Sequence, residues 1–82
     1  MTMTKPKTRV MLVDDHAVVR VGFRMLLSAD AAIEVVAEAD SGEQAYQQYP
    51  DVQPDVVIMD LSMPGMGGLE TVRRLLARDR GA

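Results

Sequence analysis

The sequence predicts an α/β fold in which three parallel strands alternate with three helices. Three observations support it. Short apolar runs occupy residues 9–14, 33–39 and 55–60, and each is followed by the spacing of an amphipathic helix. Two of these runs end in aspartate. Because this alternation is typical of parallel strands joined by right-handed crossovers, we expect one sheet with helices packed on it.

Size and composition restrict the class of protein. The chain has 82 residues, 48% of them hydrophobic and 26% charged, as in one small globular domain. It has no cysteine, which excludes disulfides and thiolate metal sites and fits a reducing cytoplasm. No apolar run approaches the ~18 residues that span a bilayer. A net charge of −3 argues against a nucleic-acid surface on this chain alone. Residues 1–8 are expected to be a flexible leader.

The first strand and helix are predicted from a change in the spacing of apolar residues along the sequence. Residues 9–14 form a continuous apolar run, which suits a strand buried on both faces. Between residues 15 and 28 the apolar positions recur at helical spacing, with Arg20 and Arg24 expected on the opposite side. The predicted core side of this helix consists of Val19, Gly22, Phe23, Leu26 and Leu27.

The second strand, residues 33–39, is expected near an edge of the sheet because Glu34 and Glu38 must reach water. Ser41 and Gln44 then form a capping-box pattern, in which the hydroxyl accepts from the Gln44 amide and the Gln44 side chain reaches back. We expect a short helix from residue 45 to about 49 that Pro50 ends.

The third strand, residues 55–60, is followed by a loop over residues 61–68 that is rich in glycine. A third helix then carries Leu69, Val72, Leu75 and Leu76. Its arginines are expected to form a solvated face that suits the negative end of the helix dipole; they are Arg73, Arg74, Arg78 and Arg80.

Acidic residues follow two of the predicted strands: Asp14 and Asp15 the first, and Asp60 the third. If these strands are neighbours, the three carboxylates meet at the carboxyl edge of the sheet. Their repulsion then requires a cation, and oxygen ligands favour a hard ion such as Mg²⁺. A carboxylate facing phosphate held by Mg²⁺ can act as a nucleophile and form an aspartyl-phosphate.

Simpler interpretations exist for single residues. An acid at a strand end often only caps the next helix; we take Asp55 in this way, and the choice stays open for Asp14 or Asp15 alone. We expect His16 to be a partly exposed polar residue at a helix start. Met59, Met63 and Met66 are expected to serve packing.

Two segments carry a family resemblance: Asp14-Asp15-His16 after an apolar strand, and the string Asp60-Leu-Ser-Met-Pro-Gly-Met-Gly-Gly68. Together they closely resemble the receiver domain of two-component response regulators, over essentially the whole chain from Arg9. The variant with His16 resembles the branch that precedes a LuxR-type DNA-binding helix-turn-helix. The resemblance implies a flavodoxin-like, doubly wound parallel sheet with strand order 2-1-3, truncated after three β-α units, over residues 9–82.

The resemblance also implies roles. Asp60 would accept phosphate from a sensor histidine kinase or phosphotransfer domain, without the chain being an enzyme beyond this self-catalysed step. Asp15 and Asp60 would contact Mg²⁺ directly, Asp14 through water, and Ser62 through its backbone carbonyl. Transcription would be controlled through a DNA-binding output domain outside this chain. The helix positions Val18, Val21 and Met25 need not all face the core, and they suit either kinase docking or ordinary packing.

The chain departs from the family after its third helix. The family's fourth strand ends in Ser or Thr and its fifth in Lys, but the only lysines here, Lys5 and Lys7, precede the first strand. The third strand would therefore be an unpaired apolar edge, and we expect self-association through it. The alternative function is a degenerate receiver that acts as a protein-interaction module without phosphorylation-driven switching.

Two enzyme classes fit less well. A phosphatase of the haloacid-dehalogenase type needs an acid two residues after its nucleophile, where this chain has Ser62. A Rossmann nucleotide binder needs a glycine-rich loop after the first strand, and none is present.

Overall fold

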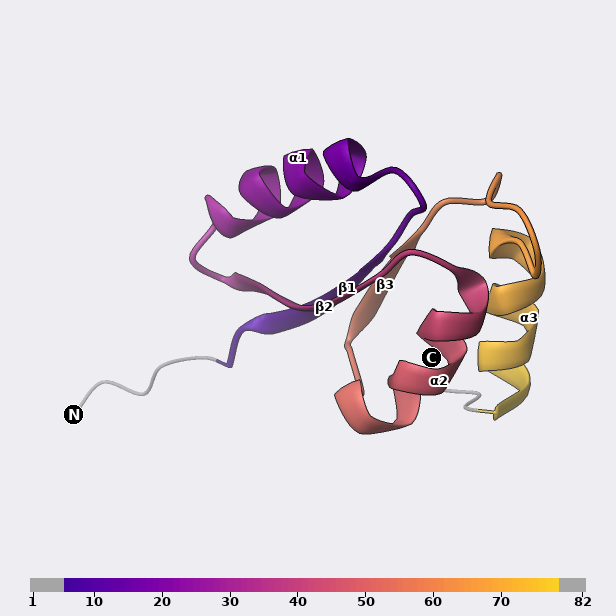
Figure 1. The fold of residues 1–82 in the computed structure, drawn as a ribbon. Helices are drawn as coiled ribbons and strands as arrows, with labels where there is room; N and C mark the ends of the chain where they lie inside the picture. The colour runs from indigo at the N-terminus through magenta and orange to yellow at the C-terminus, as the bar shows by residue number, and fades with distance from the viewer. Residues whose placement is uncertain (1–5, 79–82) are drawn as a thin grey trace.

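The computed structural model describes residues 6–78. Residues 1–5 of the predicted leader and Arg80 of the predicted arginine face lie outside this range. The chain alternates strands and helices throughout, as predicted. The elements are β1 (Thr8–Val13), α1 (Ala17–Ser28), β2 (Ile33–Ala39), α2 (Gly42–Val52), β3 (Val56–Met59) and α3 (Gly68–Arg78) (Figure 1).

The three strands form one parallel sheet in the order β2-β1-β3, which confirms the predicted order 2-1-3. Val13, the last residue of β1, pairs with Ala39 on one side and Met59 on the other. The carboxyl ends of all three strands therefore lie at one edge of the sheet. The register with β2 shifts between Val10 and Met11, so that Val36 has no partner in β1.

The core surrounds β1, whose residues Val10 to Val13 are all buried. Helices α2 and α3 pack side by side on one face of the sheet, and α1 lies alone on the other (Figure 1). Met63, from the loop before α3, joins the core cluster of β1, β2 and α2. Among the described residues, no helix has both the length and the apolar character needed to cross a bilayer.

Helix α1 differs from its prediction. None of its residues is fully buried, and Leu26, expected in the core, is 75% exposed. Arg20 and Arg24, expected on the far side, instead form ion pairs with Glu38 of β2. Three strands leave much of the apolar stripe of α1 without cover, while the long guanidinium side chains reach the edge strand beside the helix. The expectation that these arginines face away from the sheet is therefore wrong.

The start of α2 follows the predicted capping pattern with one difference. The Ser41 hydroxyl accepts from the Gln44 amide at 3.1 Å, as expected. The Gln44 side chain accepts from the amide of Asp40 at 2.7 Å and so satisfies the residue before the cap.

The prediction that Pro50 ends this helix is wrong, because α2 continues to Val52. A proline inside a helix has no N–H for the carbonyl four residues earlier, which here belongs to Tyr46. Arg78 of α3 supplies the missing donor, with its Nη1 2.8 Å from the Tyr46 carbonyl. Its guanidinium also lies 4.1 Å from the centroid of the Tyr46 ring. The residue that caps the C-terminus of the helix is Gln53, whose backbone has the left-handed conformation.

Candidate functional site

The three predicted carboxylates meet at the carboxyl edge of the sheet. The Asp14 amide donates to the Ala39 carbonyl at 3.1 Å, and the Asp60 amide donates to the Val13 carbonyl at 2.9 Å. These main-chain bonds extend the sheet by one residue on each strand. As a result, one side-chain atom from each of Asp14, Asp15, His16 and Asp60 lies within 4.8 Å of the others. The sequence predicted the three acids of this cluster but not the histidine.

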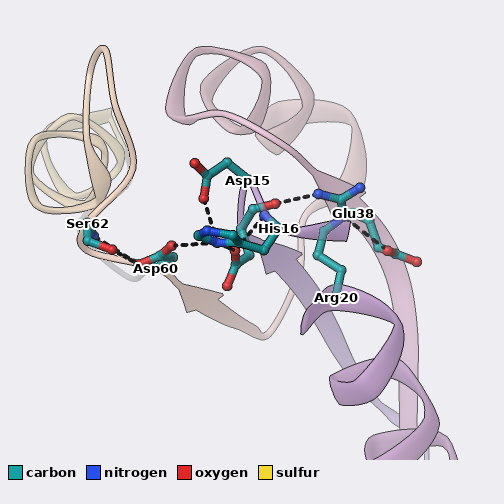
Figure 2. Close-up of polar contacts among 7 residues, drawn as sticks. Asp15, His16, Arg20, Glu38, Asp60 and Ser62 are labelled. Carbon is teal, nitrogen blue, oxygen red and sulfur yellow. Dashed lines mark hydrogen bonds and ion pairs between the residues drawn. The ribbon is translucent and has the colours of Figure 1, made fainter. Parts of the chain in front are cut away.

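The His16 ring lies among the carboxylates (Figure 2). Its Nδ1 is 2.9 Å from an oxygen of Asp14, 2.9 Å from one of Asp15 and 3.9 Å from one of Asp60. The hydrogen bond with Asp14, followed by the charges of the acids, raises the pKa of His16 above its usual 6.5. The side chain is 64% exposed, which confirms the expected exposure. The expectation of a partly exposed polar residue did not include the contacts of this ring with the acid cluster.

One carboxylate oxygen of Asp60 accepts hydrogen bonds from Ser62, and the other points toward the acid cluster and His16. The amide and hydroxyl of Ser62 donate to its Oδ1 at 2.9 and 2.8 Å, while Oδ2 is the atom nearest His16. These two bonds, the amide first, lower the pKa of Asp60. The carboxylate is therefore ionised over the whole neutral range. Ser62 contacts Asp60 through its amide and hydroxyl, and a role for its backbone carbonyl as a metal ligand stays a prediction.

The loop after Asp60 brings α3 against the Asp60 backbone. Gly67 has a φ of +73°, which favours glycine. Gly68, the first residue of α3, lies so close to the Asp60 backbone that a Cβ there would meet the Asp60 carbonyl oxygen and stand 2.6 Å from the Leu61 Cα. Met63 is buried in the core, as its predicted packing role requires. The two glycines thus let the helix begin directly beside Asp60.

The donor set fits a hard divalent cation. Three carboxylates supply oxygen ligands at one point, and a hollow of about 200 Å³ with Asp14 and Asp60 in its wall opens beside them. Carboxylate oxygens are the ligands that Mg²⁺ prefers, and their mutual repulsion favours a bound cation.

Arg20 is a second residue near the site that the predicted roles did not include. Its Nη1 donates a hydrogen bond to the main-chain carbonyl of Asp14 (Figure 2). A cation six residues after an acid, on the helix that follows it, is too common a pattern to indicate this contact from sequence alone. By contrast, the Asp55 carboxylate accepts from the Arg9 amide of β1 at 2.8 Å, so its contact is structural, although it is made with a strand and not with the helix end that was expected.

Comparison with known proteins identifies the family. Residues 10–82 match the model of the response regulator receiver domain. The chain is 48% identical over 68 residues to the response regulator GacA of Pseudomonas viridiflava, covering 83% of this chain and 32% of the relative. It is 43% identical over 75 residues to the nitrate/nitrite response regulator protein NarL of Escherichia coli, covering 92% and 34%. The chain thus spans about a third of the length of these curated relatives.

Solved structures agree. A two-component response regulator of the LuxR family from Aurantimonas matches with a TM-score of 0.89 at 45% identity, over 93% of this chain and 54% of that one. The receiver domain of the putative regulator NarL from Mycobacterium tuberculosis matches with a TM-score of 0.86 at 35% identity, over 92% and 60%. Sequence, fold and the position of the acid cluster agree with one assignment. This chain belongs to the response regulator receiver domain family of two-component systems.

Proposed function

We propose that this chain accepts a phosphoryl group on Asp60 from a histidine kinase or phosphotransfer domain, with Mg²⁺ bound by Asp14, Asp15, Asp60 and the backbone carbonyl of Ser62. The observation that carries the proposal is the convergence of three carboxylates within 4.8 Å at the end of β1 and β3. Two of them belong to one loop and the third to another, so the sheet itself assembles the site. The lowered pKa of Asp60 supports its role as an ionised nucleophile.

The phosphoryl transfer is a displacement at phosphorus. The free oxygen of Asp60 attacks, the bond from phosphorus to the donor imidazole nitrogen breaks, and the nitrogen keeps the electron pair. Ser62 holds Oδ1 through two hydrogen bonds, which leaves Oδ2 as the attacking atom. Bound Mg²⁺ supplies neutralisation of the phosphoryl oxygens. The His16 Nδ1 lies 2.9 Å from an oxygen of Asp14 and 2.9 Å from one of Asp15, so a cation held by these carboxylates would compete with the ring for them.

The consequence of phosphorylation in our proposal is control of transcription. Two findings support it: a solved neighbour is a LuxR-family regulator, and the segment that this chain matches makes up about a third of the curated response regulators. The DNA contact would belong to an output domain outside this chain, and the protein would act in the cytoplasm. In this scheme the chain is a phosphoryl acceptor that consumes its donor once per event, and the term enzyme does not describe it.

A second candidate function is a protein-interaction module that associates through β3 without switching. Two observations favour it. Strand β3 pairs only with β1, so its other edge presents free backbone groups within the described sheet. That edge borders an apolar hollow of about 240 Å³ between β3, α2 and α3, whose lining includes Val57, Leu75 and Leu76. We propose that a second copy of the chain covers this edge.

Mass spectrometry with a small phosphodonor separates the two functions. With Mg²⁺ present, the unaltered chain should gain the mass of one phosphoryl group, and Asp60→Asn should gain none. Asp55→Asn is the matched control, because Asp55 lies at the opposite end of β3, where its carboxylate accepts from the Arg9 amide. An unaltered chain that gains no mass with Mg²⁺ would favour the interaction module. A gain that persists in Asp60→Asn would refute Asp60 as the acceptor.

A further inference from the structure

The turn that carries Asp14 and Asp15 needs more than β1 to hold it. Residues 14–16 lie between the end of β1 and the start of α1, outside both elements. The Asp14 amide is anchored to β2 through the Ala39 carbonyl. The Asp14 carbonyl instead accepts from the guanidinium of Arg20, one turn into α1. This side chain therefore sets the orientation of the peptide between the two acids.

Arg20 is itself held in place by Glu38 of β2. Its side chain is only 19% exposed, and its Nε lies 3.4 Å from an oxygen of Glu38 on β2. That Nε is buried and makes no hydrogen bond among the described residues, so the attraction to Glu38 is ionic. A buried guanidinium is costly unless an opposite charge lies nearby. Glu38 thus holds Arg20 in the position from which it reaches Asp14.

We propose that Arg20 is a positioning residue of the acid site, which aims Asp14 and Asp15 at the cation position while Glu38 holds Arg20 in place. The inference rests on the proposed Mg²⁺ function. The guanidinium fork allows one nitrogen to bind the carbonyl while another faces the carboxylate, which a lysine ammonium on a flexible stem cannot reproduce. Arg20 acts through Asp14 and does not itself bind the cation.

The chain provides a matched control. Arg24 lies one turn further along α1 and forms an ion pair with the same Glu38 at 2.7 Å, on its other oxygen. Arg24 is more exposed, and its hydrogen bond among the described residues goes to Glu38. Replacing either arginine by methionine removes one positive charge from α1. Only the replacement of Arg20 removes the bond to the acid turn.

The sign of the effect separates positioning from plain electrostatics. Removing a cation near an acidic site should tighten Mg²⁺ binding if charge alone matters. Loss of a residue that orients metal ligands typically weakens metal binding by about 10- to 100-fold. We therefore expect Arg20→Met to weaken Mg²⁺ binding by about 10-fold or more. Arg24→Met should bind as tightly as the unaltered chain or more tightly.

The experiment is a calorimetric Mg²⁺ titration of the 82-residue chain and its variants, with urea unfolding measured in parallel. Weaker binding in Arg20→Met than in Arg24→Met, with Arg20→Lys recovering less than full affinity, supports the inference. Equal affinity in the two methionine variants overturns it. If Arg20→Met does not fold, the charge-conserving pair Arg20→Lys and Arg24→Lys decides: weaker binding in Arg20→Lys than in Arg24→Lys supports the inference, and equal binding overturns it. Absence of Mg²⁺ binding by the unaltered chain would overturn the proposed function itself.

Discussion

A single methyl group at Gly68 should destabilise this fold, although alanine is a better helix former than glycine. Gly68 is the first residue of α3, and a Cβ there would meet the Asp60 carbonyl oxygen and the Leu61 Cα, the latter at 2.6 Å. Both are backbone atoms that follow β3 directly. Neither can swing aside as the tip of a flexible side chain would, so the loop or the helix has to move.

The size of the effect follows from two opposed contributions. Inserting a methyl group into tightly packed surroundings costs about 1–3 kcal/mol. The gain in helix propensity from glycine to alanine is at most about 1 kcal/mol and is smaller at a helix end. The balance is a loss of about 1–2 kcal/mol in the free energy of unfolding. For a chain of this size, 1 kcal/mol corresponds to a fall in Tm of about 4–8 °C.

Gly22 provides the control for this prediction. It lies in the middle of α1, and an added Cβ would have no atom within 4 Å. Gly22→Ala should therefore stabilise the chain by about 0.5–1 kcal/mol. Urea unfolding followed by circular dichroism measures both variants. The reasoning is refuted if Gly68→Ala is as stable as the unaltered chain, or if the two variants shift the midpoint in the same direction.

Three further predictions concern pH and association. Without divalent cations, NMR titration should give a pKa of His16 above 6.5. The contribution of His16 to stability is then present below its unfolded pKa and is lost as pH rises through its folded pKa. A pKa at or below 6.5 would contradict the observed contacts. Ser62→Ala should raise the depressed pKa of Asp60, because it removes one of the two hydrogen bonds to the carboxylate. The stability that Asp60 contributes above its unfolded pKa is then lost at a less acidic pH than in the unaltered chain. Carbon NMR of the carboxyl group measures the pKa of Asp60, and an unchanged pKa would exclude a role for the hydroxyl. Val56→Lys on the β3 edge should shift the chain toward monomer in sedimentation experiments, because the open edge of β3 lies beside the apolar hollow. Val18→Lys on α1 should not, because Val18 is exposed outside the residues that line this hollow. Equal effects of the two changes would argue against association through β3.

The sheet and the acid cluster could be predicted because they depend on local patterns. Apolar runs and helical spacing identified the strands and helices, and the rule that parallel strands end at one edge brought Asp14, Asp15 and Asp60 together. The strand order required the family resemblance, because no local pattern states which strand lies in the middle. These features follow from the backbone and from the period of the side chains.

The features that were missed depend on contacts between distant parts of the chain. Pro50 continues α2 only because Arg78, on another helix, donates to the Tyr46 carbonyl. Arg20 reaches the acid turn only because Glu38 of β2 lies beside it. Sequence patterns predict that a proline ends a helix and that an arginine faces solvent, because these are the local preferences of the two residues. Whether a particular proline or arginine departs from that preference depends on contacts with other elements of the fold.

The central place of β1 has a consequence for the order in which the chain folds. Strand β1 pairs with both other strands, and each pairing closes a loop of chain. The loop between β1 and β2 is shorter than the loop between β1 and β3. Longer loops cost more chain entropy, so pairing with β3 is the slower closure. Before β3 docks, the unit of β1, α1 and β2 contains two of the acids but lacks Asp60. A ligand that requires all three carboxylates therefore binds only after β3 has docked, and its binding energy adds to the stability of the three-stranded sheet rather than of the β1-α1-β2 unit.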